Sequence, residues 1–298
     1  MGVESQRVSE IRPDQLCDDA SELMTASLLP VYEVAAGVAA WELLFIVSGA
    51  LLAIVCRGDG QTVVAIADAS ERAKATTKLV EQGPSYVCAF IHACIVGVRG
   101  VSHIYALFGA PIAVQLALPP ESHPLHAAVA GTMTTNVIFL SWLIYDVQHL
   151  VRSYPKLGGV DTIAHHCGFI GVSLLCGHYG IMCFQFAWLI TGELSSIALN
   201  IRWALIATGR GDTAMLKAAN VLFALAFFVT RVLLYGLGLV HLLRNHAALG
   251  SLEGVRPSLV LFIVTMLAAG YGLNLMWMSK IVKMASGQPR PRGGKKEQ

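Results

Sequence analysis

The sequence predicts an all-α, polytopic transmembrane bundle of about seven helices, and three observations support this prediction. Hydrophobic residues make up 55% of the 298 positions and charged residues only 13%, against about 25% charged residues in a typical soluble domain. The mean hydropathy is +0.61, and apolar segments of membrane-spanning length recur along the chain. Lipid therefore surrounds most of this protein, and a net charge of +2 gives no electrostatic reason to expect a nucleic-acid partner.

Seven apolar segments have the length that a bilayer requires, since a hydrocarbon core of about 30 Å takes roughly 20 helical residues. They are residues 31–55, 86–108, 128–150, 162–180, 182–206, 218–243 and 259–282. An acidic amino-terminal segment, 1–30, which we expect to be flexible, and a basic carboxyl-terminal tail, 286–298, lie outside these spans.

The first two segments differ in their polar side chains. The first contains Glu42, which faces either the bundle or an oligomer contact, and the sequence identifies no partner for it. In the second, His92, Arg99 and His103 form one stripe at 100° per residue. Because charged side chains within lipid generally face a bundle interior or a cavity, we expect this stripe to point inward.

The third and fourth segments carry an acid and two imidazoles at a similar depth. Asp146 lies near the end of the third segment, and His165 and His166 lie near the start of the fourth. An imidazole that a carboxylate orients can act as a general base or as a nucleophile. This pattern indicates acyl-transfer or proton-transfer chemistry.

The last three segments carry the remaining polar groups. Glu193 and Asn200 share one face of the fifth segment, and Arg202 follows them. Arg231 lies in the sixth segment and Asn274 in the seventh. Glu193 either takes part in a site or neutralises an arginine of the second or sixth segment and so joins two helices.

The histidines do not form a metal-ligand pattern. Membrane di-iron enzymes need several HxxxH and HxxHH clusters, and the ten histidines of this chain supply neither. His123 and His126 form an isolated pair in a Pro-rich loop with no third ligand nearby. We therefore expect no metal and no other cofactor, and a zinc site is the less favoured alternative.

Basic residues are divided unequally between the two sides of the predicted bundle. The side that carries the amino terminus has four Lys and Arg residues, and the opposite side has fourteen, one of them, Lys280, near the end of the last span. Cytosolic loops hold the excess of basic residues, so we expect a cytosolic carboxyl terminus and a lumenal amino terminus. Lys295 and Lys296 resemble a dilysine retrieval signal of endoplasmic reticulum membrane proteins; the alternative is a basic tail attracted to anionic lipid.

The order of motifs over residues 80–285 resembles the TLC-domain family. The motifs are Ser85 followed by His92, SWLIYD ending in Asp146, the His165–His166 pair, GELSSIALNIRW, FFVTRV with Arg231, and LNLMW with Asn274 and Trp277. The resemblance implies six helices around a long lipid-accessible cavity, with the first span, 31–55, at the periphery. The family includes ceramide synthases, which join an acyl group from acyl-CoA to a sphingoid base, and members linked to membrane lipid composition.

Site residues follow from this resemblance by position. In the synthases the paired histidines are essential, so His165 and His166 inherit a catalytic role, and Asp146 inherits that of the nearby acid. The residues expected to contact substrate are His92, Arg99, Glu193, Asn200, Arg202, Arg231 and Asn274. Membrane lipids are the expected partners, with acyl-CoA as a co-substrate and a second copy of the chain in a homo-oligomer.

The sequence also departs from the synthase pattern. Synthases place a His-Asp pair after the paired histidines, whereas here His178 precedes Tyr179 and the stretch HHCGFIGVSLLCGHYG contains no Asp. The stretch between the first two spans is too short for the soluble insertion of many synthases. The sequence is therefore more similar to the non-synthase branch, and two functions stay open: acyl transfer to a lipid amine or hydroxyl, and non-catalytic lipid binding or sensing.

Overall fold

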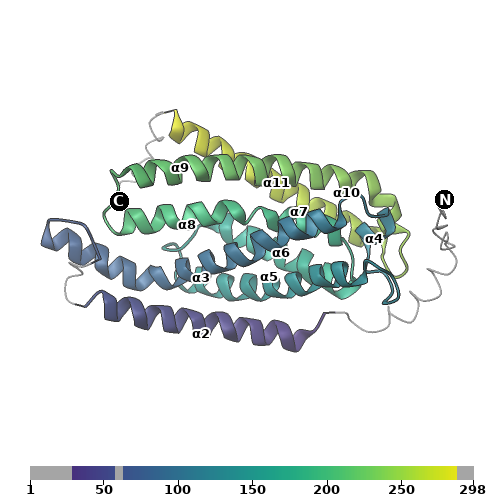
Figure 1. The fold of residues 1–298 in the computed structure, drawn as a ribbon, viewed down its shortest axis with the longest axis horizontal. Helices are drawn as coiled ribbons and strands as arrows, with labels where there is room; N and C mark the ends of the chain where they lie inside the picture. Colours follow the sequence, from purple (N-terminus) through teal and green to yellow (C-terminus); the bar gives the residue numbers. More distant parts are fainter. Residues whose placement is uncertain (1–28, 58–62, 287–298) are drawn as a thin grey trace, which may run out of the picture.

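The computed structural model describes residues 29–57 and 63–286, and within them the protein is an all-α bundle (Figure 1). The predicted fold class and its seven candidate membrane spans are confirmed. Five spans are single helices: α2 (Val31–Val55), α3 (Ala69–Leu107), α5 (His126–Arg152), α6 (Val160–Tyr179) and α11 (Pro257–Ala285). The fifth span comprises α7 (Cys183–Thr191) and α8 (Leu194–Ala207), and the sixth comprises α9 (Ala214–Phe227), the π-helix η1 (Phe228–Leu234) and α10 (Tyr235–Gly250).

The two ends of the bundle differ in composition. At one end α2 ends and α3 begins, α5 is followed by α6, α8 is followed by α9, and α11 ends (Figure 1). We call it the basic end because its connections carry Arg57, Lys156 and Arg210. The short helix α4 (Ile112–Leu116) and the turn between α6 and α7 lie at the opposite end. The predicted segment 1–30 and tail 286–298 fall almost entirely outside the described residues.

Helix α3 begins earlier than the hydropathy pattern predicts, at Ala69 instead of residue 86. Its first turns carry charged side chains, which a search for apolar segments excludes. A local signal nevertheless begins the helix, because the Asp68 side chain accepts a hydrogen bond from the Glu71 backbone N–H at 2.8 Å. The added turns extend α3 beyond the predicted span at the basic end (Figure 1).

The fifth span is interrupted where a continuous helix, 182–206, is predicted. Gly192 and Glu193 form a tight turn between α7 and α8, in which the Gly192 and Glu193 N–H groups donate to the Leu189 and Ile190 carbonyls at 3.1 and 3.0 Å. Glycine has a low helix propensity, which is consistent with a break here. The opposing sixth span contains η1, and π-helical turns often occur at functional sites. The irregular backbone of both spans therefore meets inside the bundle.

Helix α2 lies at the edge of the bundle, where it packs on α3 and α5 (Figure 1). Only 11% of the residues in its most apolar 18-residue stretch are buried inside the protein. Gly37 permits the close approach to α5, since a Cβ atom there would lie 2.6 Å from Ser141 Oγ. Glu42 faces the bundle, and its two carboxylate oxygens lie 3.1 and 3.2 Å from His149 Nε2. The structure thus supplies the partner that the sequence did not identify.

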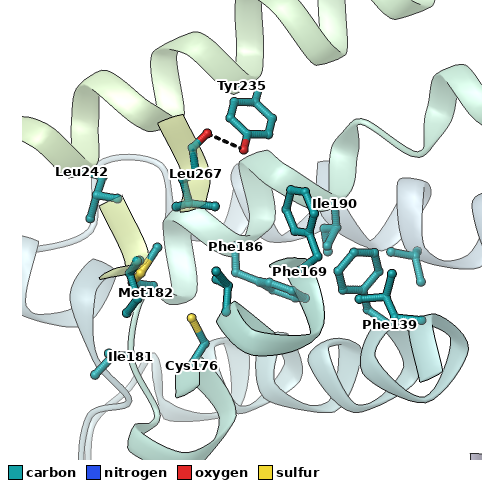
Figure 2. Packing of buried hydrophobic residues seen from close by; sticks show 14 of the residues in the cluster. Phe139, Phe169, Cys176, Ile181, Met182, Phe186, Ile190, Tyr235, Leu242 and Leu267 are labelled. Atoms are coloured by element: carbon teal, nitrogen blue, oxygen red, sulfur yellow. Dashed lines mark hydrogen bonds between the residues drawn. The ribbon is translucent and has the colours of Figure 1, made fainter. Parts of the chain in front are cut away.

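The half of the bundle toward α4 is filled by a hydrophobic core, which Figure 2 shows around Phe139, Phe169 and Phe186. Within it the Tyr235 hydroxyl donates to the Leu267 carbonyl at 2.9 Å (Figure 2). At the α4 end of this core, the turn between α6 and α7 pairs with the chain around α4. Met182 N–H donates to the Leu116 carbonyl at 2.6 Å, and Met182 is fully buried. This end of the bundle is therefore closely packed.

Candidate functional site

A cavity of about 910 Å³ lies between the second to seventh spans and reaches the basic end. Its wall includes residues of α3, α5, α6, α8, α9, η1 and α11, but none of α2. It extends from Arg231 inside the bundle to Ala285, the last residue of α11. The prediction that six spans surround a cavity is confirmed.

The predicted catalytic residues come together on this wall. His165 and His166 of α6 and Asp146 of α5 all line the cavity. His166 Nδ1 lies 3.4 Å from Asp146 Oδ2, although the two groups are not aligned as a hydrogen bond. Only 9% of the His166 surface is exposed, so the rest of the residue is buried against other side chains.

Aromatic rings hold the two imidazoles. The edge of Trp142 meets His166 with ring centroids 5.4 Å apart, and Trp142 stacks on His92 at 3.9 Å. His165 lies against Trp277 at 5.2 Å, and the Trp277 indole donates to Asp161 Oδ2 at 3.2 Å. His92 therefore lies behind Trp142, outside the cavity wall.

An acid–base pair forms the inner part of the cavity. Glu193 Oε1 accepts a hydrogen bond from Arg231 at 2.9 Å. Arg231 also donates to the Gly192 carbonyl at 3.1 Å and to the hydroxyls of Ser195 and Ser196 at 2.9 and 3.1 Å. Of the two arginines that the sequence offered, Glu193 thus pairs with that of the sixth span. Ser195, which sequence reasoning did not select, completes this network.

The other predicted contact residues take three positions. Asn200 and Arg202 line the cavity toward the basic end. Asn274 lines a hollow of about 20 Å³ behind the paired histidines, and neither of its amide atoms has a hydrogen-bond partner among the described residues. Arg99 lies outside both spaces, where it donates to Thr135 Oγ1 at 2.7 Å and to the Gly131 carbonyl at 3.2 Å.

Lys280 is a lining residue that sequence reasoning missed. Lys280 lies near the end of the predicted segment 259–282, where a lysine reads as one more basic residue of the cytosolic side. Its spacing of three from Trp277 places it on the same face of α11, and this periodicity is the signal that could have identified it. Within residues 29–57 and 63–286, three or more His, Cys, Asp or Glu side chains do not group as metal ligands would.

The fold and this site define a polytopic membrane protein with a histidine–carboxylate pair in a cavity between its spans. The TLC-domain family model matches residues 85–283, and the chain belongs to this family. It is 24% identical over 206 residues to the human TLC domain-containing protein 4, an alignment that covers 67% of this chain and 72% of the relative. That relative is named for its domain and not for a synthase activity. No solved structure matches the chain.

Proposed function

We propose that this protein transfers a fatty acyl group from acyl-CoA to the amine or hydroxyl of a membrane lipid, as ceramide synthases do. The observation that supports this proposal is the His166–Asp146 pair on the wall of a cavity between membrane spans. A general base must lie within reach of the proton that it removes and must be oriented by a neighbouring group. In this proposal Asp146, 3.4 Å from His166 Nδ1, turns to accept a hydrogen bond from it when substrate binds, and the cavity offers space for an acyl chain.

The reaction uses His166 as a base and then as an acid. With Asp146 beside Nδ1, the Nε2 atom takes the proton from the acceptor while its oxygen or nitrogen attacks the thioester carbonyl. The new ester or amide bond forms, the carbon–sulfur bond breaks, and the CoA sulfur takes the proton from Nε2. His165 lines the same cavity, and Asn200 and the Glu193–Arg231 pair contact the acceptor head group.

Charge placement supports a cytosolic supply of acyl-CoA. The cavity reaches the end of the bundle that carries the excess of Lys and Arg residues, and cytosolic loops hold such an excess. In the proposed orientation the basic end faces the cytosol. The dilysine motif at Lys295 and Lys296 supports residence in the endoplasmic reticulum.

Turnover by purified protein tests the proposal. Labelled palmitoyl-CoA is supplied with a mixture of lipid acceptors, and the acylated lipid is measured for the native chain, His165→Ala and His166→Ala. His178→Ala serves as the matched control, because His178 is an exposed histidine of the same helix outside the cavity wall. We expect product from the native chain and the control and none from His166→Ala. Undiminished product from both paired-histidine variants would refute the assignment.

A second function, non-catalytic lipid binding or sensing, is favoured by the packing of the paired histidines. Trp142 and Trp277 contact their rings, as they would in a rigid binding wall. This function predicts stoichiometric lipid retention without turnover in the same experiment. An acyl group bonded to an imidazole nitrogen would support the enzyme instead.

A further inference from the structure

The charges on the cavity wall do not balance. The wall carries two acids, Asp146 and Glu193, and three permanent cations, Arg202, Arg231 and Lys280. Arg231 is paired with Glu193 at 2.9 Å, and Asp146 lies 3.4 Å from His166. The cations therefore exceed the acids by one, and neither acid forms an ion pair with Arg202 or Lys280 among the described residues.

Arg202 is oriented by a neighbouring amide. Its Nε atom donates to Asn220 Oδ1 at 2.7 Å, and both residues line the cavity. The terminal nitrogens of the guanidinium make no hydrogen bond or ion pair with the described residues. Because a guanidinium binds phosphate through parallel N–H donors, anchoring at Nε leaves its fork available to a ligand.

Lys280 is the second of these cations. It is exposed, it has no ion-pair partner among the described residues, and it lines the cavity together with Ile281 and Met284 of the same helix. A lysine ammonium on a flexible stem can move toward an anion that an arginine holds elsewhere on the same wall. The cavity wall therefore offers two different cationic donors, one from α8 and one from α11.

The two cations lie nearer the mouth than the histidines. His165, His166 and Glu193 line the same small hollow and so share a depth. Arg202 lies nine residues after Glu193, which corresponds to about 13 Å along α8 toward the basic end. Lys280 lies one helical turn beyond Trp277, which contacts His165. A ligand that reaches the histidines therefore passes both cations.

We propose that Arg202 and Lys280 bind the phosphate group of an amphiphile whose acyl chain lies in the cavity. This inference deepens the proposed function and rests on it, because acyl-CoA carries its phosphates a pantetheine arm away from the reacting thioester. A phospholipid head group presents the same chemistry, so the test separates the two sources. The inner wall, where Arg231 is paired with Glu193, then contacts the rest of the ligand.

The test measures dissociation constants of the purified full chain for three probes: palmitoyl-CoA, dioleoyl phosphatidic acid and uncharged dioleoylglycerol. The variants are Arg202→Gln and Lys280→Gln. Lys283→Gln is the matched control, because Lys283 is an exposed lysine of the same helix outside the cavity wall. Each cavity variant should weaken a phosphate-bearing probe about tenfold, as the loss of one charge-assisted hydrogen bond predicts. Added salt should reduce the difference.

The pattern of losses decides the outcome. A loss for palmitoyl-CoA alone identifies acyl-CoA as the ligand, and a loss for phosphatidic acid alone identifies a phospholipid. Unchanged affinities in both variants, an equal loss in Lys283→Gln, or an equal loss for dioleoylglycerol would overturn the proposal. Lys280 is exposed, so Lys280→Glu retains the fold and gives a larger loss even where Arg202→Gln does not fold.

Turnover in the same preparations separates this proposal from the proposed function. Charge-dependent binding of palmitoyl-CoA without any acylated product overturns acyl transfer and leaves the phosphate site in place. Acylated product with unchanged affinity in both cavity variants overturns the phosphate site and leaves acyl transfer in place.

Discussion

Removal of either partner of the Glu193–Arg231 pair should strongly destabilise the fold. The two side chains are 15% and 13% exposed and their atoms lie 2.9 Å apart, and breaking a buried pair by removing one partner costs about 3–5 kcal/mol. Since both residues border a cavity that can admit water, we expect a loss of about 3 kcal/mol for Arg231→Met, near the lower limit of that range. Glu193→Gln should cost somewhat less, because its amide retains an acceptor for the arginine.

A double-mutant cycle isolates the interaction between the two side chains. The free energy of unfolding is measured by reversible denaturation in mixed micelles for Arg231→Met, Glu193→Gln and the double variant. The double variant should be about 2 kcal/mol more stable than the sum of the single losses predicts, within the range of contacting residues. Arg244→Met, at an exposed arginine of the same span, is the control and should change stability by less than about 0.5 kcal/mol. Additive losses, or a loss below about 1 kcal/mol for Arg231→Met, would refute the reasoning.

Three further substitutions test the packing around the site. Gly100→Ala should lower the free energy of unfolding by about 1–3 kcal/mol, because the new Cβ would lie 2.9 Å from the Thr191 backbone nitrogen. The control Gly272→Ala, with open space around it, should leave the stability unchanged. Equal losses for the two variants in thermal denaturation would contradict this prediction. His92→Phe should preserve the fold and any turnover, since the His92 ring stacks on Trp142 and its nitrogens have no hydrogen-bond partner among the described residues. Loss of turnover with an intact fold would assign His92 a chemical role. Glu42→Gln should cost about 1 kcal/mol or less in the same denaturation assay, and a larger loss would mean that its contact with His149 fixes α2.

The fold was largely predictable because membrane spans are long, apolar and separated by polar connections. The prediction failed where local signals outweigh average hydropathy. The charged first turns of α3 are helical because Asp68 caps them, and the turn at Gly192 divides a segment that is apolar on both sides. Hydropathy averaged over many residues does not detect a single capping side chain or a two-residue turn.

The site was predictable in part, because an ionisable side chain inside a span must face protein or a cavity. This rule selected His166, Asp146, Glu193 and Arg231 without any knowledge of which helices are neighbours. It did not choose between Arg99 and Arg231 as the partner of Glu193, since that choice depends on how the spans pack. Lys280 was missed for the opposite reason: a charge near the end of a span carries no penalty that marks it as unusual.

The packing of α4 against the turn between α6 and α7 gives the cavity a direction. Met182 and Leu116 close one end through their backbone hydrogen bond, and the hydrophobic core fills the space beneath them (Figure 2). The cavity is thus closed toward α4 and open toward the basic end, and it does not form a channel through the bundle. A ligand that enters at the basic end therefore does not pass through the bundle to its opposite end, and the two sides of the protein differ in their access to the cavity.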